Sequence, residues 1–341
     1  MIYEVKNFFN PTKEQINKIL QEITELLKIN VGVDINEIKK IEEGQNLNFA
    51  LSGFDLRNNM GVKFLLKIIS KKGYPNIEEL VKCYELLNSR FHTIIYHDSS
   101  SLIAPYGFVV QKWIDGEIQL SNKDIGHKYD ENEDIRWLKD FVKPLKKVHS
   151  VKFDYFGSIN GSLNFSSIHE YYNNIDEVVR WSFGKIKDEG IILNELVRHK
   201  VLDDNFLKYV LSNVKRLAEN IGVKESVLIY GDMFPSNLIY QDNEPIIIDW
   251  DECRANWWVY EIARTTFYVD SNHIARKFIE YYNPTDPLEE IDIGIRIEHV
   301  KQHLRKICIL CMNREKDLEL MKQVTTIKNK IINRIKAPFL F

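Results

Sequence analysis

The spacing of apolar residues divides the chain into a first part that mixes helix and strand patterns and a second part that is mainly helical. Residues 11–28 carry apolar side chains at helical spacing, and Asn10 or Thr12 can cap this helix. Three segments rich in apolar and β-branched residues then predict strands, at 35–41, 47–54 and 62–69. Residues 76–91 return to helical spacing, with their apolar residues on one face.

Three more strands are predicted to complete a small sheet, at 93–96, 101–104 and 106–114. Beyond Gly116 most segments have helical spacing, at 134–149, 167–187, 203–220 and from 272 onward. The last of these is interrupted at 283–287, where Asn and Pro cluster. With 341 residues, the chain is long enough for two domains or lobes.

One stretch of the second part, residues 226–252, contains polar residues where an apolar pattern would not place them. Asp232 and Asn237 flank a turn that contains a proline, and Asp249 follows a run of isoleucines. Two short apolar segments separated by turn residues predict a hairpin: 238–240 and 246–248. Such a hairpin would carry Asn237 and Asp249 to the same end.

These three side chains suit phosphoryl transfer. An amide and a carboxylate, from Asn237 and Asp249, are oxygen ligands that Mg²⁺ accepts, and they leave positions for water and phosphate oxygens. The carboxylate of Asp232, outside the metal shell, could orient or deprotonate a hydroxyl group. An Asp and an Asn around a turn usually make only local backbone hydrogen bonds, but the hairpin and its terminal Asp favour the chemical interpretation.

The same stretch carries a family resemblance. Tyr-Gly-Asp-Met-Phe-Pro-Ser-Asn at 230–237, followed by Ile-Ile-Asp-Trp-Asp at 247–251, resembles the catalytic motif and metal-binding Asp of the aminoglycoside phosphotransferase and choline kinase family. The resemblance implies an α+β, two-lobed protein-kinase-like fold. Its N-terminal lobe would be a small antiparallel sheet and its C-terminal lobe mainly helical, with three segments: 1–110 for the first lobe, 111–117 for a hinge and 118–341 for the second lobe.

The family resemblance also implies an activity and a role for each motif residue. The protein would use ATP or GTP with Mg²⁺ to phosphorylate a hydroxyl of a small molecule, such as an aminoglycoside, a choline-like amino alcohol or a sugar. Asp232 would be the catalytic residue, and Asn237 and Asp249 would hold the metal. Tyr230 stands where the family has His, and because Tyr can also pack and form a hydrogen bond, an active enzyme is expected. A degenerate kinase-like binding or assembly protein, such as those allied to spore-coat proteins, is the alternative.

The loop between the first two strands resembles the family's nucleotide loop, through Gly44, Asn46 and Asn48. Without the resemblance it is an ordinary hairpin turn. Three residues on a later strand resemble the hinge whose backbone hydrogen-bonds the adenine base: Gln111, Lys112 and Trp113. Trp113 is equally well explained as a core residue.

A lysine within the third strand resembles the kinase lysine that contacts the α- and β-phosphates. Lys67 lies among apolar residues, whereas Lys63 begins the strand and is expected to be exposed. The family pairs this lysine with a glutamate from the following helix. Three glutamates are available there, Glu78, Glu79 and Glu85. The spacing typical of the family favours Glu79, while a helical wheel places Glu85 nearer the apolar face.

Other polar and aromatic residues in the second part have mainly structural interpretations. Glu261 replaces a family Asp and is expected to anchor the loop that carries the metal site. Trp257 and Trp258 could face a cationic substrate, but core packing is expected for at least one of them. His299 and His303 are spaced for one helix face without a zinc motif, so solvated or pocket-lining histidines are expected.

Composition narrows the class of protein and its expected location in the cell. The net charge of -3 provides no global basic field for nucleic acid, and 44% hydrophobic with 28% charged residues is ordinary for a soluble protein. Four cysteines are too few and scattered for a disulfide framework, so buried thiols are expected. No signal peptide pattern is present, and no apolar run approaches the roughly 20 residues of a membrane span. These features predict a cytoplasmic enzyme without a membrane partner, and they leave its acceptor and oligomeric state open.

Overall fold

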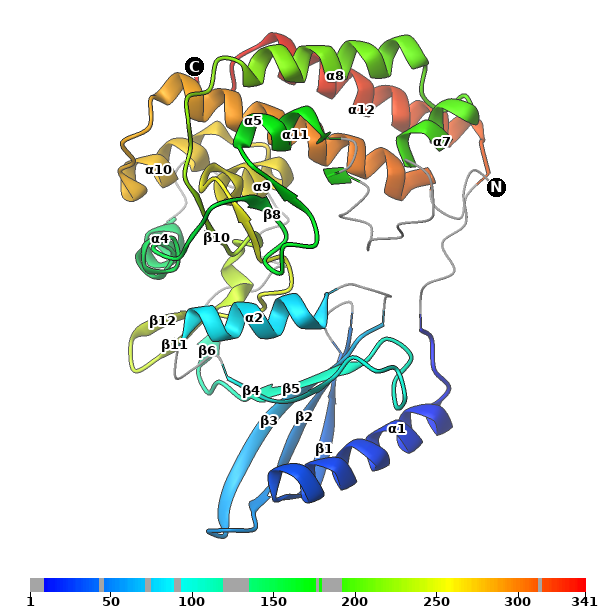
Figure 1. The fold of residues 1–341 in the computed structure, drawn as a ribbon, viewed down its shortest axis with the longest axis vertical. Helices are drawn as coiled ribbons and strands as arrows, with labels where there is room; N and C mark the ends of the chain where they lie inside the picture. Colours follow the sequence, from blue (N-terminus) through cyan, green and yellow to red (C-terminus); the bar gives the residue numbers. More distant parts are fainter. Residues whose placement is uncertain are drawn as a thin grey trace. The chain divides into compact units, whose positions relative to one another are not determined.

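The computed structural model describes residues 9–42, 46–70, 75–88, 93–118, 135–175, 178–179, 192–311 and 315–341. The chain separates into two compact units, one spanning Lys6–Asp115 and the other Gly116–Phe341 (Figure 1). Within the described ranges, no helix combines the length and the apolar character needed to cross a membrane.

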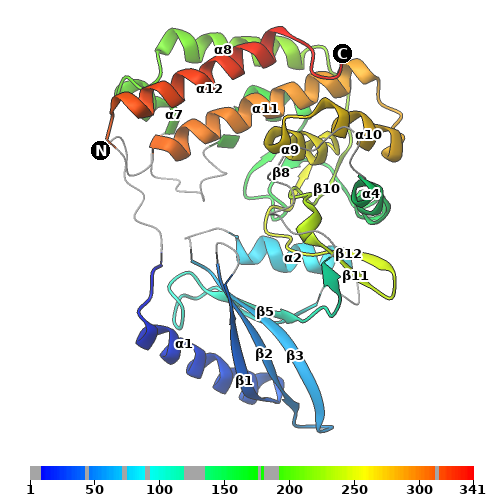
Figure 2. The same ribbon diagram turned by 180° about the vertical axis from the view of Figure 1, so that it is seen from behind.

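The first unit is built on an antiparallel sheet of five strands in the order β1-β2-β3-β5-β4. Its strands are β1 Val33–Ile41, β2 Leu47–Asp55, β3 Met60–Ile68, β4 Ile94–Asp98 and β5 Phe108–Lys112. These five strands confirm the strands predicted at 35–41, 47–54, 62–69, 93–96 and 106–114. Helix α1, Lys13–Leu26, lies across this sheet (Figure 2) and buries Ile19 and Ile23 against Phe49, Leu51 and Leu66.

Hydrogen bonds from capping side chains fix where the helices α1 and α2 of this unit begin. Thr12 Oγ1 accepts a hydrogen bond from Gln15 N at 3.2 Å, and the Gln15 side chain accepts one from Thr12 N at 2.8 Å. This reciprocal pair satisfies two backbone donors that the first turn of α1 leaves open. Helix α2, Ile77–Leu87, begins at Asn76, whose Oδ1 accepts from Glu79 N at 3.2 Å.

The strand predicted at 101–104 is wrong. These residues form bends between β4 and β5, and Ser101 has a φ of 61°, which is incompatible with an extended strand. Asp98 Oδ1 accepts from Ser100 N at 2.8 Å, and Ser100 Oγ accepts from Leu102 N at 3.4 Å. The side chains of Asp98 and Ser100 thus favour a turn over the strand that the apolar pair after the serines indicated.

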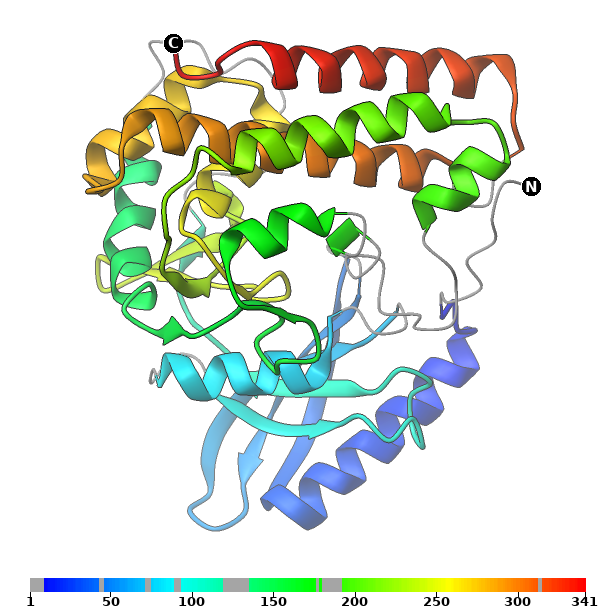
Figure 3. The same cartoon turned by 45° about the horizontal axis from the view of Figure 1, so that its top comes forward.

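The second unit is mainly helical. Its described helices are α4 Arg136–Val148, α5 Ile168–Asn173, α7 Ile192–Arg198, α8 Asp204–Ala218, α9 Val259–Val269, α10 Asn272–Tyr282, α11 Leu288–Cys311 and α12 Leu318–Lys336. Helix α11 packs against α8, α9 and α12, and Figure 3 shows α8, α11 and α12 side by side. The helix predicted at 167–187 is present as α5, and residues 176–177 and 180–191 lie outside the described part of the chain.

Two small sheets complete this unit. One has the order β7-β10-β13-β8-β9, built from β7 Lys152–Phe153, β8 Phe156–Gly157, β9 Asn164–Phe165, β10 Ser226–Ile229 and β13 Arg254–Asn256. The other has the order β12-β11-β6, built from β6 Glu117–Ile118, β11 Leu238–Gln241 and β12 Glu244–Ile247. Strand β10 begins the stretch 226–252 that the sequence singled out, and β13 follows that stretch.

Of the two alternatives predicted for His299 and His303 on α11, solvated or pocket-lining, the first is wrong. His299 is fully buried, with Nε2 at 3.0 Å from both Thr266 Oγ1 and the carbonyl oxygen of Ala263, and His303 is buried beside Phe267. Neither is solvated, and burial lowers the pKa of His303 to about 3. The four cysteines are all buried free thiols, as predicted.

Candidate active site

The predicted hairpin is confirmed, and it brings together the two residues predicted to hold a metal. Strands β11 and β12 pair with Leu238 opposite Ile247, and Asp242 and Asn243 both have positive φ in the two-residue turn. The ladder continues past the strands, because Ile248 N donates to the carbonyl oxygen of Asn237 at 2.9 Å. Asn237 and Asp249 therefore lie at one end of the hairpin, as the sequence indicated.

Asn237 is fixed against Asp232. Its Nδ2 donates to both the main-chain oxygen and Oδ2 of Asp232, each at 3.0 Å. A main-chain oxygen only accepts hydrogen bonds, so the amide nitrogen must face Asp232 and the amide oxygen is directed away. The contact leaves Asn237 Oδ1 as the oxygen that a cation would use.

Asp249 is exposed, and its backbone has a φ of 62°. This left-handed conformation is several-fold enriched in Asp and Asn compared with other non-glycine residues. It ends the extended run of β12 and turns the chain at the position of the carboxylate. Trp250, the next residue, is buried and donates from Nε1 to the carbonyl oxygen of Ile247 at 3.1 Å.

Glu261, in the first turn of α9, anchors the loop before Asp232. Its two carboxylate oxygens accept from Tyr230 N at 2.6 Å and from Gly231 N at 2.8 Å, and the side chain is fully buried. The Nε2 atom of His149 lies 3.3 Å from the same carboxylate. The anchoring role predicted for Glu261 is confirmed.

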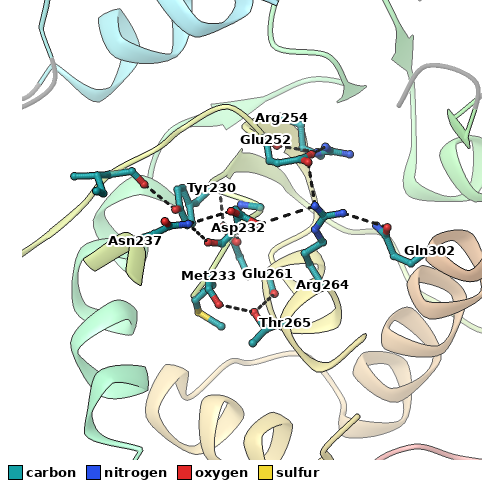
Figure 4. A network of polar contacts seen from close by, with 12 residues as sticks. Tyr230, Asp232, Met233, Asn237, Glu252, Arg254, Glu261, Arg264, Thr265 and Gln302 are labelled. Atoms are coloured by element: carbon teal, nitrogen blue, oxygen red, sulfur yellow. Dashed lines mark hydrogen bonds and ion pairs between the residues drawn. The ribbon is translucent and has the colours of Figure 1, made fainter. Parts of the chain in front are cut away.

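Two neighbours complete this support. Thr265, one turn further along α9, donates from Oγ1 to the carbonyl oxygen of Met233 at 3.0 Å (Figure 4). Gly231 has a φ of 83°, and a Cβ there would lie 2.8 Å from the carbonyl oxygen of Glu252. The loop therefore needs glycine at this position.

Tyr230 joins the loop that carries Asp232, residues 230–237, to the segment of Asp249. It is fully buried, and its hydroxyl donates to the carbonyl oxygen of Ile248 at 2.7 Å. Its ring packs edge-on against Trp250, with 5.0 Å between ring centroids. Tyrosine thus supplies the packing and hydrogen bonding expected of it where the family has His.

The environment of Asp232 favours its protonated form. Burial raises its pKa from 3.8 to about 7, the Arg264 guanidinium at 4.0 Å opposes the shift, and the charges of Glu252 and Asp249 add to it. The Asn237 hydrogen bond also lowers the value. A carboxylate with a pKa near neutrality can take a proton from a hydroxyl and release it again.

Arg264 is a site residue that the sequence analysis missed. Its Nη2 donates to Glu252 Oε1 at 3.0 Å, and its Nη1 donates to Gln302 Oε1 at 3.2 Å (Figure 4). The available signal was an arginine three residues after Glu261 in a stretch of α9 that has no other charged residue. Charged residues are almost never fully buried unless they are paired, so this arginine implied a partner.

In the first unit, the structure places the predicted nucleotide residues on β2, β3 and α2. Lys67 is buried and lies opposite Asn48 in the β2–β3 ladder, so both side chains share one face of the sheet. Asn46 Oδ1 accepts from Ser70 N at 3.1 Å, while Gly44 lies outside the described residues. Lys63 is exposed, as expected.

Burial separates the candidate glutamates of α2, because Glu79 is buried whereas Glu78 and Glu85 are exposed. On β5, the side chain of Gln111 accepts from Tyr84 Oη at 2.7 Å. The next two main-chain nitrogens donate within the unit, Lys112 N to Thr93 O at 2.9 Å and Trp113 N to Lys63 O at 3.2 Å. Trp113 is half-buried, with the ammonium of Lys63 4.1 Å from its ring centre.

Residues 37–290 match the sequence model of the phosphotransferase enzyme family. In structure, the chain is similar to an ethanolamine kinase of Plasmodium vivax, with a TM-score of 0.60, 18% identity, and coverage of 98% of this chain and 94% of that one. It is also similar to the aminoglycoside phosphotransferase APH(4)-Ia, with a TM-score of 0.59, 13% identity, and coverage of 96% and 100%. A mutant of that enzyme was crystallised as a ternary complex with AMP-PNP and hygromycin B.

A putative fructosamine-3-kinase from Haemophilus somnus is similar too, with a TM-score of 0.57, 12% identity, and coverage of 94% of this chain and 100% of that one. No curated protein matches the chain significantly in sequence. At these identities the solved structures establish the fold, and the predicted α+β, protein-kinase-like class is confirmed.

Proposed function

Because the chain belongs to the phosphotransferase enzyme family, we propose that it transfers the γ-phosphoryl group of ATP or GTP to a hydroxyl group of a small molecule. The observation that carries this proposal is the arrangement of Asp232 and Asn237. A carboxylate with a pKa of about 7 lies 3.0 Å from an amide whose oxygen faces away from it. A proton acceptor and a metal ligand are thereby held side by side without competing for each other.

The residues present fit a Mg²⁺ ion. Asn237 Oδ1 and the exposed carboxylate of Asp249 are hard oxygen donors at one end of the hairpin, held together by the Ile248–Asn237 backbone hydrogen bond. Among the described residues there is no group of three or more His, Cys, Asp or Glu side chains able to hold a metal. Two protein ligands are the number expected when phosphate oxygens and water complete the shell. When bound, Mg²⁺ would neutralise charge on the phosphate groups.

The chain's own groups would perform the remaining tasks. Asp232 would orient the acceptor hydroxyl and take its proton as the new oxygen–phosphorus bond forms and the bond to the leaving nucleoside diphosphate breaks. General base catalysis of this kind contributes about 10²–10⁴-fold to the rate. Glu261 and Thr265 would act as positioning residues, since they hold the loop rather than contact the reacting atoms.

For the nucleotide, we assign Lys67 to the α- and β-phosphates and Glu79 to the support of Lys67. The burial of both side chains within one unit supports this assignment. The loop residues Gly44, Asn46 and Asn48 would approach the phosphates, and the hinge at Gln111, Lys112 and Trp113 would line the base. The AMP-PNP complex of the similar APH(4)-Ia adds support for a nucleotide ligand.

The test is release of nucleoside diphosphate, measured with ATP or GTP, with and without Mg²⁺, over hydroxyl acceptors of several classes. We expect Mg²⁺-dependent turnover that falls at least 100-fold in Asp232→Asn, while nucleotide binding remains. Asp249→Ala should lose Mg²⁺-dependent nucleotide binding. Intact nucleotide binding without turnover of any acceptor would instead identify a degenerate kinase-like binding protein.

A further inference from the structure

Tyr240 lies on the middle strand of the sheet β12-β11-β6, close to the proposed metal ligands. Its neighbours across the sheet are Pro245 on β12 and Glu117 on β6. Asn237 precedes Tyr240 by three residues, and Asp249 follows the other strand of the same hairpin. The strand that carries Tyr240 therefore leads directly to one of the two ligands.

The hairpin depends on the rest of the unit for its position. Its strands β11 and β12 have four residues each, and β6 contributes only two more. A hairpin of this size is marginally stable by itself in water. The turn residues Asp242 and Asn243 are exposed, so they add no support at that end. Contacts along the sides of the hairpin must then fix where its ligand end lies.

The hydroxyl group of Tyr240 provides one such contact. It donates to Asp140 Oδ2 at 2.6 Å and so joins β11 to α4 across 100 positions of the chain. A hydrogen bond of this length from a hydroxyl to a carboxylate is about twice as strong as one between neutral groups. Burial, together with the hydrogen bond to Asp140 and the charge of that carboxylate, raises the pKa of Tyr240 above its usual 10.0. The hydroxyl thus keeps its proton and remains the donor.

Helix α4 also supports the loop 230–237 through the residue next to Asp140. Phe141 is fully buried, and its ring stacks on Tyr230 with 6.1 Å between ring centroids. Tyr230 in turn donates to the carbonyl oxygen of Ile248, at the end of the hairpin. Helix α4 packs against β12 as well. Adjacent residues of one helix therefore hold the loop of the proposed base and the hairpin of the proposed metal ligands.

On its other side, β11 is packed too closely to shift. A Cβ on Gly116 would lie 2.7 Å from the carbonyl oxygen of Tyr240 and 2.1 Å from Cγ2 of Ile239. Strand β6, which begins immediately after Gly116, pairs with the same two residues of β11. The backbone of β11 is thus confined by β6, and its side chain at Tyr240 is held by α4.

We propose that Tyr240 and Asp140 are positioning residues, whose hydrogen bond holds the hairpin so that Asn237 Oδ1 and the Asp249 carboxylate can bind one divalent cation together. The inference rests on the proposed function. Neither Tyr240 nor Asp140 would touch the cation, and both would act through the backbone of β11. Without their hydrogen bond the ligand end of the hairpin would move more freely. The affinity for the cation should then fall, whereas the nucleotide contacts assigned to the first unit should be unaffected.

The experiment measures binding of Mn²⁺, which accepts the same oxygen ligands as Mg²⁺, by electron paramagnetic resonance in the presence of saturating AMP-PNP. Tyr240→Phe removes the hydroxyl and keeps the ring, and it should raise the Kd of Mn²⁺ roughly fivefold or more. The affinity for AMP-PNP without any metal should stay unchanged. Asp140→Asn should act in the same direction. The double variant should be no weaker than Tyr240→Phe, because both changes remove one contact.

Hydrogen exchange provides a readout that needs neither metal nor nucleotide. The amide of Ile248 donates to the carbonyl oxygen of Asn237 at 2.9 Å and so reports on the ligand end of the hairpin. In Tyr240→Phe this amide should exchange roughly fivefold faster, since local opening becomes less costly. Tyr155→Phe is the matched control, because it removes a hydroxyl that donates at 2.7 Å to the carbonyl oxygen of Ile159 in the same unit. It should change neither the Kd of Mn²⁺ nor the exchange of Ile248.

The outcomes separate this inference from the proposed function. Equal Mn²⁺ affinity in the wild type and Tyr240→Phe would overturn the inference while the proposed function stands. Equal losses of Mn²⁺ affinity and of metal-free AMP-PNP affinity would also overturn it, because they indicate a general loss of structure. If Tyr240→Phe weakens Mn²⁺ binding selectively but the wild type phosphorylates no acceptor, the proposed function fails and the positioning role stands.

Discussion

The carboxylate of Glu261 offers the sharpest test of how buried hydrogen bonds fix the loop that carries Asp232. In Glu261→Gln the side chain keeps its shape but has one accepting oxygen instead of two. Only one of the backbone N–H groups of Tyr230 and Gly231, now bonded at 2.6 and 2.8 Å, can then be satisfied. The other would face the new NH₂ group, which is itself a donor.

The expected cost follows from these two contacts. A hydrogen bond to a charged group contributes about 1.5–3 kcal/mol, and leaving a buried donor unsatisfied costs about 1–3 kcal/mol. Glu261 is fully buried, so water cannot replace the lost acceptor. Since the two terms overlap, we expect the free energy of unfolding to fall by about 3–4 kcal/mol. The loop carrying Asp232 should also shift, which lowers kcat.

Urea unfolding followed by tryptophan fluorescence measures the first effect, because Trp250, Trp257 and Trp258 are buried in the same unit. Glu261→Asp is the matched control: it shortens the side chain but keeps two acceptor oxygens, and it should lose less stability and activity than the Gln variant. A Gln variant that unfolds within about 1 kcal/mol of the wild type and keeps its kcat would refute the anchoring argument.

Three further predictions concern the same loop. Asp232→Asn should become more stable relative to the wild type as pH rises from about 4 to 8. The reason is that the folded-state pKa of Asp232, about 7, lies above the usual 3.8, so ionisation of the wild-type carboxyl favours unfolding. Parallel curves of Tm against pH for the two proteins in this window would contradict the prediction. Tyr230→Phe removes the hydrogen-bond donor to the Ile248 carbonyl oxygen, so the free energy of unfolding measured in urea should fall by about 1–2 kcal/mol. Mg²⁺-dependent nucleotide binding should also weaken. Unchanged values of both would show that the hydroxyl is dispensable. Gly231→Ala should lower the free energy of unfolding by about 1–3 kcal/mol, because of the φ of 83° at this position and the 2.8 Å contact of the new Cβ with the Glu252 carbonyl oxygen. A thermal shift assay should show a lower Tm for the variant.

The parts of the site that the sequence predicted are those that are local along the chain. The contact of Asp232 with Asn237 spans a single turn, and the hairpin carries Asp249 to Asn237 through backbone pairing alone. Turn residues and alternating apolar segments encode such contacts directly. The resemblance of the motif to a known family then supplied the fold class.

The parts that the sequence did not reveal depend on tertiary packing. Arg264 reaches Gln302 across 38 positions of the chain, and no periodic pattern encodes which helices meet. The same packing buries His299, whose helical spacing indicated only a shared face with His303. Helix α11 hides polar residues on most of its circumference, so an amphipathic pattern could not identify its buried face.

The side chains that hold the loop of Asp232 lie on one helix, and a partner of Arg264 lies on another. Glu261, Arg264 and Thr265 are on α9, whereas Gln302 is on α11. Substitutions on α11 can therefore shift the Arg264 guanidinium, and with it the charge near Asp232, while the hydrogen bonds from Glu261 and Thr265 to the loop stay in place. Such a separation lets selection adjust the acidity of Asp232 in single steps without first displacing the loop.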